Sequence, residues 1–192
     1  FVNAGKLLSA NAVGAVLGLV ATVVTARTLG PQNYGILALV LVYELTVGKL
    51  VTFNAWQAII KFGSEALHAH DRAGLRQLIK FGFALDVVSA LAGTALAMIL
   101  AGPVIRLLGW DASVRPLLVL YSVLILFGLS GTPIGVLRLF DRFDLLSYTA
   151  VLSAAVRLVG VAWCFLTSQR LFGFVLVYLI TGIVGQLYQI VA

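Results

Sequence analysis

The stretch LLSANAVGAVLGLVATVVTA, residues 7–26, decides the fold, because it is apolar over its whole length and carries no charge. Lys6 precedes it and Arg27 follows it. A helix needs about 20 mostly apolar residues to cross the hydrocarbon core of a bilayer. Strands of a membrane barrel would alternate apolar and polar residues over about ten positions, and this stretch does not alternate. It therefore predicts a transmembrane helix.

Five more stretches of similar character follow. Together with the first they predict six transmembrane helices, over residues 7–26, 34–53, 81–105, 117–137, 145–166 and 171–192. Gly30 and Pro31 mark the turn after the first span, and Pro133 predicts a kink or weak point in the fourth. The connections are short except residues 61–80, which we interpret as a long loop. Asp71, within it, is a plausible N-cap, so we expect the third helix to begin outside the membrane. We expect an all-α, polytopic membrane helix bundle that forms a single transmembrane lobe over residues 1–192.

Composition restricts the possible functions. Of the 192 residues, 61% are hydrophobic and 10% are charged, whereas a soluble domain has about 25% charged residues. This excludes a soluble globular enzyme. One cysteine, Cys164, excludes an internal disulfide and a cysteine-based metal cage. The sequence contains no phosphate loop, nucleophile motif or metal-ligand spacing, so we expect no enzyme, no cofactor and no metal.

The distribution of loop cations predicts the orientation. The net charge is +6. With the N-terminus inside, the cations on the inner side are Lys6, Lys61, Arg72, Arg76, Lys80, Arg138 and Arg142. Those on the outer side are Arg27, Arg106, Arg115 and Arg170. The positive-inside rule therefore favours cytoplasmic termini in the cytoplasmic membrane. The apolar end of the chain leads us to expect a piece of a longer protein.

Charged residues inside the predicted spans are the candidate functional residues. A charge at a helix centre costs about 2.5–3.5 kcal/mol on insertion scales, so it normally faces protein or water. Arg157 lies in mid-span among small residues, Lys49 is a second cation, and Asn11 lies on a polar stripe. We interpret these three as candidates for a substrate cavity. Asp86 and Glu44 are candidates for ion coupling or for pairing between helices, with Arg157 as one possible partner.

Two segments resemble a known family. The segment ARTLGPQNYG, residues 26–35, resembles the turn after the first helix of bacterial and archaeal polysaccharide exporters. The segments GVLR (135–138) and DRFDLL (141–146) resemble a second motif of the same proteins. These are flippases for lipid-linked oligosaccharides, including O-antigen and teichoic-acid exporters, in the superfamily of multidrug, oligosaccharidyl-lipid and polysaccharide exporters. The matching motif residues, which we expect to be structural, are Arg27, Gly30, Pro31, Tyr34, Gly35, Arg138, Arg142 and Asp144.

The resemblance implies an architecture and a function. It implies two six-helix lobes around a central cavity, of which this chain would be the N-terminal one. It further implies that the protein flips precursors of cell-envelope polysaccharides, such as lipopolysaccharide, by alternating access. The expected partners are membrane lipids, a polyprenyl-pyrophosphate-linked oligosaccharide and the C-terminal lobe, and not nucleic acid. Arg27 would cap the first helix or touch headgroups, and Arg142 would pair with Asp141 or Asp144.

Two alternatives stay open. A cation-coupled multidrug extruder of the same superfamily would be favoured by acidic residues in the membrane. A membrane-embedded transferase of envelope assembly would need a polar domain elsewhere in the protein.

Overall fold

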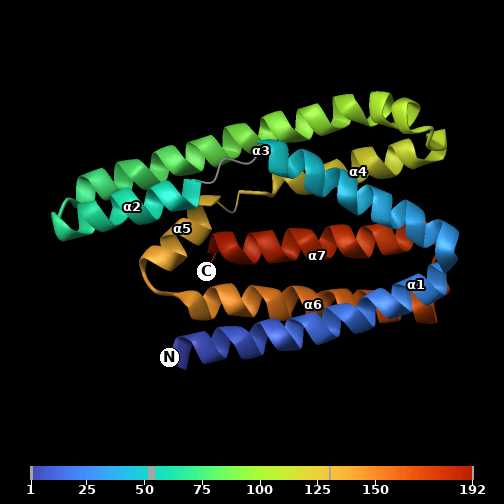
Figure 1. Ribbon diagram of the computed structural model, residues 1–192, viewed down its shortest axis with the longest axis horizontal. Coiled ribbons are helices and arrows are strands. Elements are labelled where there is room, and N and C mark those ends of the chain that lie inside the picture. The colour runs from blue at the N-terminus through green and yellow to red at the C-terminus, as the bar shows by residue number, and fades with distance from the viewer. Residues whose placement is uncertain (1, 52–54, 130, 192) are drawn as a thin grey trace.

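The fold is a bundle of long helices, as predicted (Figure 1). The computed structural model describes residues 2–51, 55–129 and 131–191, with side chains from residue 12 onward except that of Ala55. The described elements are α1 (Val2–Val51), α2 (Ala55–His68), α3 (Arg72–Leu108), the short 3₁₀ helix η1 (Ala112–Val114), α4 (Arg115–Leu126), α5 (Gly131–Leu139), α6 (Phe143–Leu166) and α7 (Leu171–Val191). Five helical segments in this part of the chain are long and apolar enough to cross a membrane.

The first of these segments contains a sharp bend at Gly30. This residue has φ 72° and ψ 171°, and the two arms of α1 diverge from the bend in a V in Figure 1. Only glycine adopts this backbone region readily, because it has no Cβ. Pro31 follows in the first turn of the second arm, where its missing N–H leaves no bond unmade. The Asn33 amide donates to the Leu29 carbonyl at 3.3 Å, across the bend. The predicted turn between the first two spans is confirmed.

The predicted long loop over residues 61–80 is wrong, because most of it is helical. α2 extends to His68, and α3 starts at Arg72, with three residues between the two helices. The prediction that Asp71 is an N-cap is confirmed, since its Oδ1 accepts from the Gly74 N–H at 2.9 Å. The α2 helix forms because its apolar face packs on α5 and α3, with Ile59 buried. Because α2 also carries exposed charged residues, it is amphipathic, and a search for wholly apolar stretches does not find it.

The predicted fourth span, residues 117–137, is two helices instead of one. α4 ends at Leu126 and α5 begins at Gly131. The chain therefore breaks ahead of Pro133, which lies in the first turn of α5, where proline is tolerated. The prediction of a weak point near Pro133 is confirmed, but the helix is interrupted between α4 and α5 and is not merely kinked.

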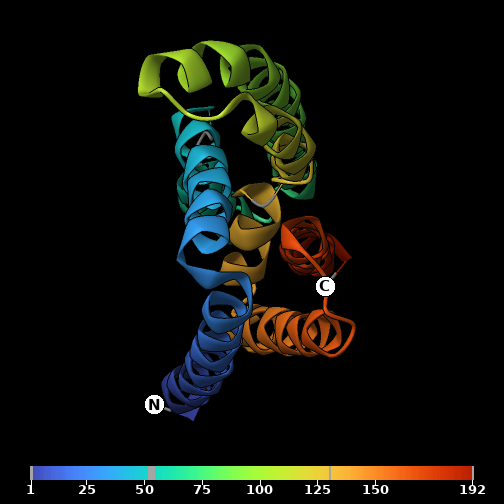
Figure 2. The same ribbon diagram turned by 90° about the vertical axis from the view of Figure 1, so that its right-hand side faces the viewer.

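The ends of the helices agree with six passes. Both chain ends, the α2–α3 turn and the α5–α6 turn lie at one end of the bundle in Figure 1. The bend of α1, the α3–η1 connection and the α6–α7 connection lie at the other. The end-on view in Figure 2 shows the first arm of α1 beside α6, and the second arm leaning towards α3 and α4.

Close backbone contact fixes the first of these pairings. A Cβ on Gly14 would lie 3.3 Å from the Ala150 carbonyl oxygen of α6. The buried face of α6 around it includes Ala154, Val161 and Cys164. Small residues at such positions let helix backbones approach in lipid, where packing drives helix association.

Single-cysteine labelling checks the six-pass topology. In a Cys164→Ala background, cysteines replace five exposed residues: Gln32, Ala69, Ala112, Phe140 and Gln169. We expect a membrane-impermeant maleimide to label positions 32, 112 and 169 from outside, and positions 69 and 140 only after the membrane is opened. Labelling of positions 32 and 69 from the same side contradicts the topology.

Substitution of Gly30 checks the bend. Gly30→Ala places a Cβ in a backbone region that only glycine favours, so we expect a loss of about 1–3 kcal/mol in the free energy of unfolding. The matched control is Gly35→Ala, because no atom lies within 4 Å of the added Cβ there. Thermal unfolding in detergent should show a lower midpoint for Gly30→Ala alone. Equal midpoints for the two variants would show that the bend is not strained by a side chain.

Candidate functional site

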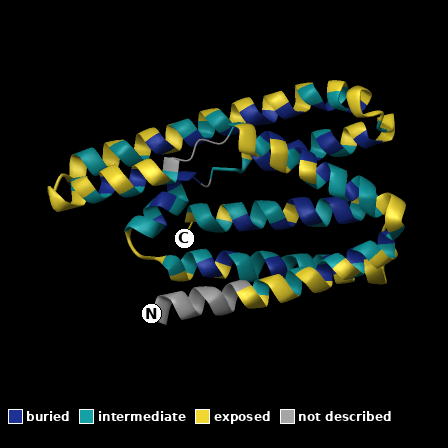
Figure 3. Ribbon diagram, in the orientation of Figure 1, coloured by how far each residue is buried: buried dark blue, intermediate teal, exposed yellow. Residues whose placement is uncertain are grey.

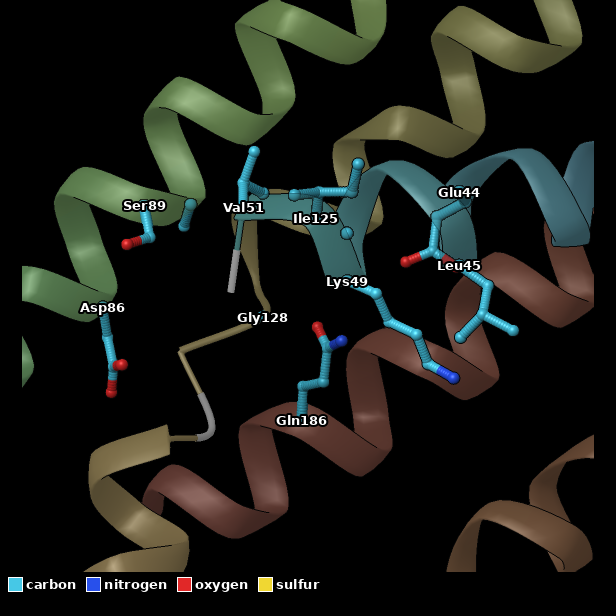
Figure 4. Close-up of a pocket in the computed structure, with 11 residues that line it drawn as sticks. Glu44, Leu45, Lys49, Val51, Asp86, Ser89, Ile125, Gly128 and Gln186 are labelled. Atoms are coloured by element: carbon cyan, nitrogen blue, oxygen red, sulfur yellow. The ribbon is translucent and has the colours of Figure 1, made fainter. Parts of the chain in front are cut away.

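A polar cavity of about 160 Å³ lies inside the bundle (Figure 4). Its lining comes from the second arm of α1, from α3, from the break between α4 and α5, and from α7. The polar side chains that line it are Glu44, Lys49, Asp86, Ser89 and Gln186. A water molecule occupies about 30 Å³ in the liquid, so the space has room for several waters. The arrangement provides a half-open polar space in an otherwise apolar bundle.

Asp86 connects this cavity to the start of α5. It is 5% exposed, and its Oδ2 accepts from the Thr132 backbone N–H at 2.6 Å. A Cβ on Gly131 would lie 2.7 Å from the Asp86 Oδ1, so the carboxylate fits closely against the first residue of α5. The first N–H groups of a helix have no partner within it, and a negative charge there is favoured by the helix dipole. Asp86 therefore caps α5 from the neighbouring helix α3.

Two other predicted candidates reach the same cavity. Glu44 is half-buried and Lys49 is exposed, one helical turn and a half apart on the second arm of α1. Figure 4 shows Asp86 and Ser89 on one side of the space, with Lys49 and Gln186 on the other. The structure thus brings Asp86 of α3 to the same cavity as Glu44 and Lys49 of α1.

Gln186 is a cavity residue that sequence reasoning missed. Its side-chain oxygen is buried and has no hydrogen-bond partner among the described residues. An uncharged amide in the apolar run of α7 did not stand out in a search for charges. The signal that could have found it is that an amide within a span is available to hydrogen-bond across helices.

Arg157 occupies a different position from these residues. Its guanidinium lies over the Tyr178 ring, 4.9 Å from the ring centroid, and its buried Nε has no hydrogen-bond partner in the described part of the chain. The Tyr178 hydroxyl lies 3.5 Å from the Thr25 Oγ1 of α1. Arg157 thus belongs to a contact among α1, α6 and α7, and it does not line the 160 Å³ cavity.

Within the described residues the recorded ion pair is Arg142–Asp144, so Arg157 pairs with neither Asp86 nor Glu44. Asn11, the third predicted cavity residue, lies outside the residues whose side chains are described.

The residues of the first motif shape the bend of α1. Gly30 and Pro31 make the turn, Arg27 is exposed just before it, and Tyr34 packs half-buried against the core. A Cβ added at Gly35 would meet no neighbouring atom within 4 Å. The exposure of Arg27 fits contact with headgroups.

The residues of the second motif stabilise the short helix α5 and its exit. The Arg138 guanidinium lies over the Trp56 ring of α2, 4.4 Å from the centroid, and its Nε is buried without a hydrogen-bond partner among the described residues. Arg142 pairs with Asp144 at 3.2 Å, at the exposed entry to α6. Of the two predicted partners of Arg142, the structure selects Asp144.

Among the described residues, no group of three His, Cys, Asp or Glu side chains is placed to hold a metal ion.

Substitution of Asp86 tests the cap on α5. Asp86→Ala leaves the Thr132 N–H without its acceptor, and loss of an N-cap costs about 0.5–2 kcal/mol. Asp86→Asn keeps an acceptor oxygen and should cost less. The matched control is Ser89→Ala, which removes another polar group from the same cavity and helix. We expect thermal unfolding of the full-length protein in detergent to rank the midpoints Ser89→Ala, Asp86→Asn, Asp86→Ala, from highest to lowest. A midpoint for Asp86→Ala equal to that for Ser89→Ala would contradict the cap.

Comparison with known proteins places these features in a family. A family model described as polysaccharide biosynthesis protein matches residues 2–192. Inner membrane protein YghQ of Escherichia coli (strain K12) is 33% identical to the chain over 165 residues. The match covers 85% of this chain and 46% of that relative, so the chain spans about half the relative's length. No solved structure matches the chain significantly.

The match to an inner membrane protein agrees with the helices found here. Five segments are long and apolar enough to cross a membrane, and the first is bent at Gly30. The protein is therefore a multi-pass protein of the inner membrane. With a family model that extends over nearly the whole described chain, the chain belongs to the polysaccharide biosynthesis protein family.

Proposed function

We propose that the full-length protein flips lipid-linked oligosaccharide or polysaccharide precursors across the cytoplasmic membrane, with this chain as one of two lobes. The observation that carries the proposal is the polar cavity inside an apolar helix bundle of a polysaccharide biosynthesis family. A polar headgroup needs such a hydrated route, because the hydrocarbon core provides no hydrogen bonds. The lipid tail stays in the bilayer, and rocking of two lobes would alternate the opening. In this proposal the protein is a transporter and not an enzyme.

Cationic side chains support an anionic substrate. Lys49 lines the cavity, and the buried Nε of Arg157 has an unused donor in the described structure. Arginine binds phosphate through a planar fork of donors, and lysine binds it as a compact charge. We propose that these two residues, with Asn11 on the first arm of α1, contact the pyrophosphate and sugar headgroup. This role of Arg157 requires a shift of its side chain away from the Tyr178 ring.

A second function receives support from the acids of the same cavity. Glu44 and Asp86 both line it, as an extruder of cationic drugs would need. Asp86 already caps α5, so Glu44 is the better candidate for coupling to an ion. A drug extruder would tolerate loss of the cations and fail on Glu44→Gln. A flippase would instead tolerate Glu44→Gln and lose export when Arg157 is replaced.

Substitution of Arg157 tests the proposed flippase. Arg157→Ala in the full-length protein should lower export by about tenfold or more, because a charge-assisted contact is worth about 1.5–3 kcal/mol. Arg157→Lys should keep part of the activity, since the charge remains and the fork is lost. The measurement is flipping of a lipid-linked oligosaccharide in proteoliposomes at matched protein amounts.

Two controls separate binding from stability in this test. Arg170→Ala removes an exposed arginine from a turn and should leave export unchanged. Thermal unfolding of each variant shows whether loss of the contact between Arg157 and Tyr178 destabilises the bundle. Wild-type export by a correctly folded Arg157→Ala protein would eliminate Arg157 as a substrate contact.

A further inference from the structure

We propose that Arg72, Arg76 and Lys80 form a binding surface for the headgroups of anionic phospholipids, separate from the substrate route. The three cations recur every four residues at the start of α3, so they lie on one face of the helix over about 12 Å. All three are exposed, as is Gln77 beside them. With Ala73 these residues line a surface hollow of about 420 Å³.

We call Arg72, Arg76 and Lys80 the row. The opposite face of the same helical turns explains why the row points outward. Leu75, Leu78 and Ile79 are half-buried, and the Leu75 side chain lies 3.5 Å from where a Cβ on Gly63 of α2 would be. This apolar face holds α3 against α2. Figure 3 shows that the tip of the α2–α3 hairpin extends beyond the bundle and is largely exposed.

The charges of the row have no internal balance. In the described part of the chain none of the three cations pairs with a carboxylate, and the adjacent Asp71 carboxylate is used by the Gly74 N–H. Like charges four residues apart destabilise a helix, and Arg72 lies at its positive N-terminal end. An external anion removes both penalties. The surface is therefore electrostatically incomplete without a negatively charged partner.

The position of the row along α3 identifies that partner as a membrane lipid. Arg106, near the other end of α3, lines a second basic hollow of about 320 Å³ with Arg115. Thirty residues of helix separate Arg76 from Arg106, which is about 45 Å. A bilayer with its two headgroup layers is about 40–45 Å thick. The two basic hollows thus lie at the depths of the two headgroup layers.

Exposed apolar side chains continue the surface into the hydrocarbon. Phe81 follows Lys80 directly and is 65% exposed, and Phe83 is 39% exposed. A phosphate held by the row would have its acyl chains beside these rings. A soluble anion such as free phosphate would make no contact with the apolar side chains of Phe81 and Phe83. Their exposure therefore favours a phospholipid as the ligand.

Energy transfer from a single site measures lipids near the row. The donor dye is attached to Ala69→Cys, in the turn before α3, in full-length Cys164→Ala protein. The protein is placed in nanodiscs that contain phosphatidylcholine with a minor fraction of phosphatidylglycerol. Acceptors are headgroup-labelled versions of each lipid. We expect transfer to phosphatidylglycerol to exceed transfer to phosphatidylcholine by about threefold.

Two charge-matched variants locate the effect. The triple variant Arg72→Gln, Arg76→Gln, Lys80→Gln should lose the preference. The control Arg27→Gln, Arg115→Gln, Arg170→Gln removes the same charge from the other end of the bundle and should keep it. Because all six side chains are exposed, thermal unfolding should confirm that both variants fold.

The remaining outcomes overturn the proposal. An unchanged preference in the first triple variant would show that the row does not select the lipid. Displacement of phosphatidylglycerol by inorganic phosphate, beyond the effect of chloride at equal ionic strength, would indicate a free-anion site instead. Export by the row variant is measured separately, so the lipid surface and the proposed flippase can fail independently.

Discussion

The lack of water in the bilayer core is the constraint on which this structure depends, and Asp86 is where it acts most sharply. A helix that starts inside a membrane presents N–H groups that neither lipid nor the helix itself can satisfy. α5 starts at Gly131, within a candidate span, and the Asp86 carboxylate accepts from the Thr132 N–H at 2.6 Å. An acid buried on α3 thus makes a broken fourth span possible.

The broken span in turn creates the polar cavity. Gly128, in the interruption, lines the space together with Asp86 and Gln186. In a continuous helix the backbone N–H and C=O groups would hydrogen-bond to each other. Only side chains would then face this region. The interruption provides backbone atoms and room for water among helices that are otherwise closely packed. Structural support for α5 and a hydrated interior therefore have a common origin.

The sequence predicts the elements of this fold better than it predicts their contacts. Runs of about 20 apolar residues find the spans, because the hydrocarbon thickness sets their length. The same criterion overlooks α2, whose stability comes from one apolar face. Pro133 reveals a weak point in the fourth span but not the gap before it, because the gap depends on the bond from Thr132 to Asp86, which is 46 residues earlier in the chain.

The candidate site is likewise predictable only in part. The cost of burying a charge correctly draws attention to Glu44, Lys49 and Asp86, which share one cavity. That cost does not reveal that Arg157 lies over an aromatic ring, because a π-face has no charge pattern to search for.

The contact between Thr25 and Tyr178 has a consequence for synthesis of the protein. These residues are 153 positions apart, so the first arm of α1 enters the membrane long before α7 exists. Ribosomes add about 5–20 residues per second, which leaves a delay of roughly 8–30 s. During that interval the inner face of the arm meets lipid or the insertion machinery instead of its final neighbours. The sequence of this arm must therefore be apolar enough to be stable in lipid before its partner helix α7 is synthesised. Residues 7–26 contain no charge.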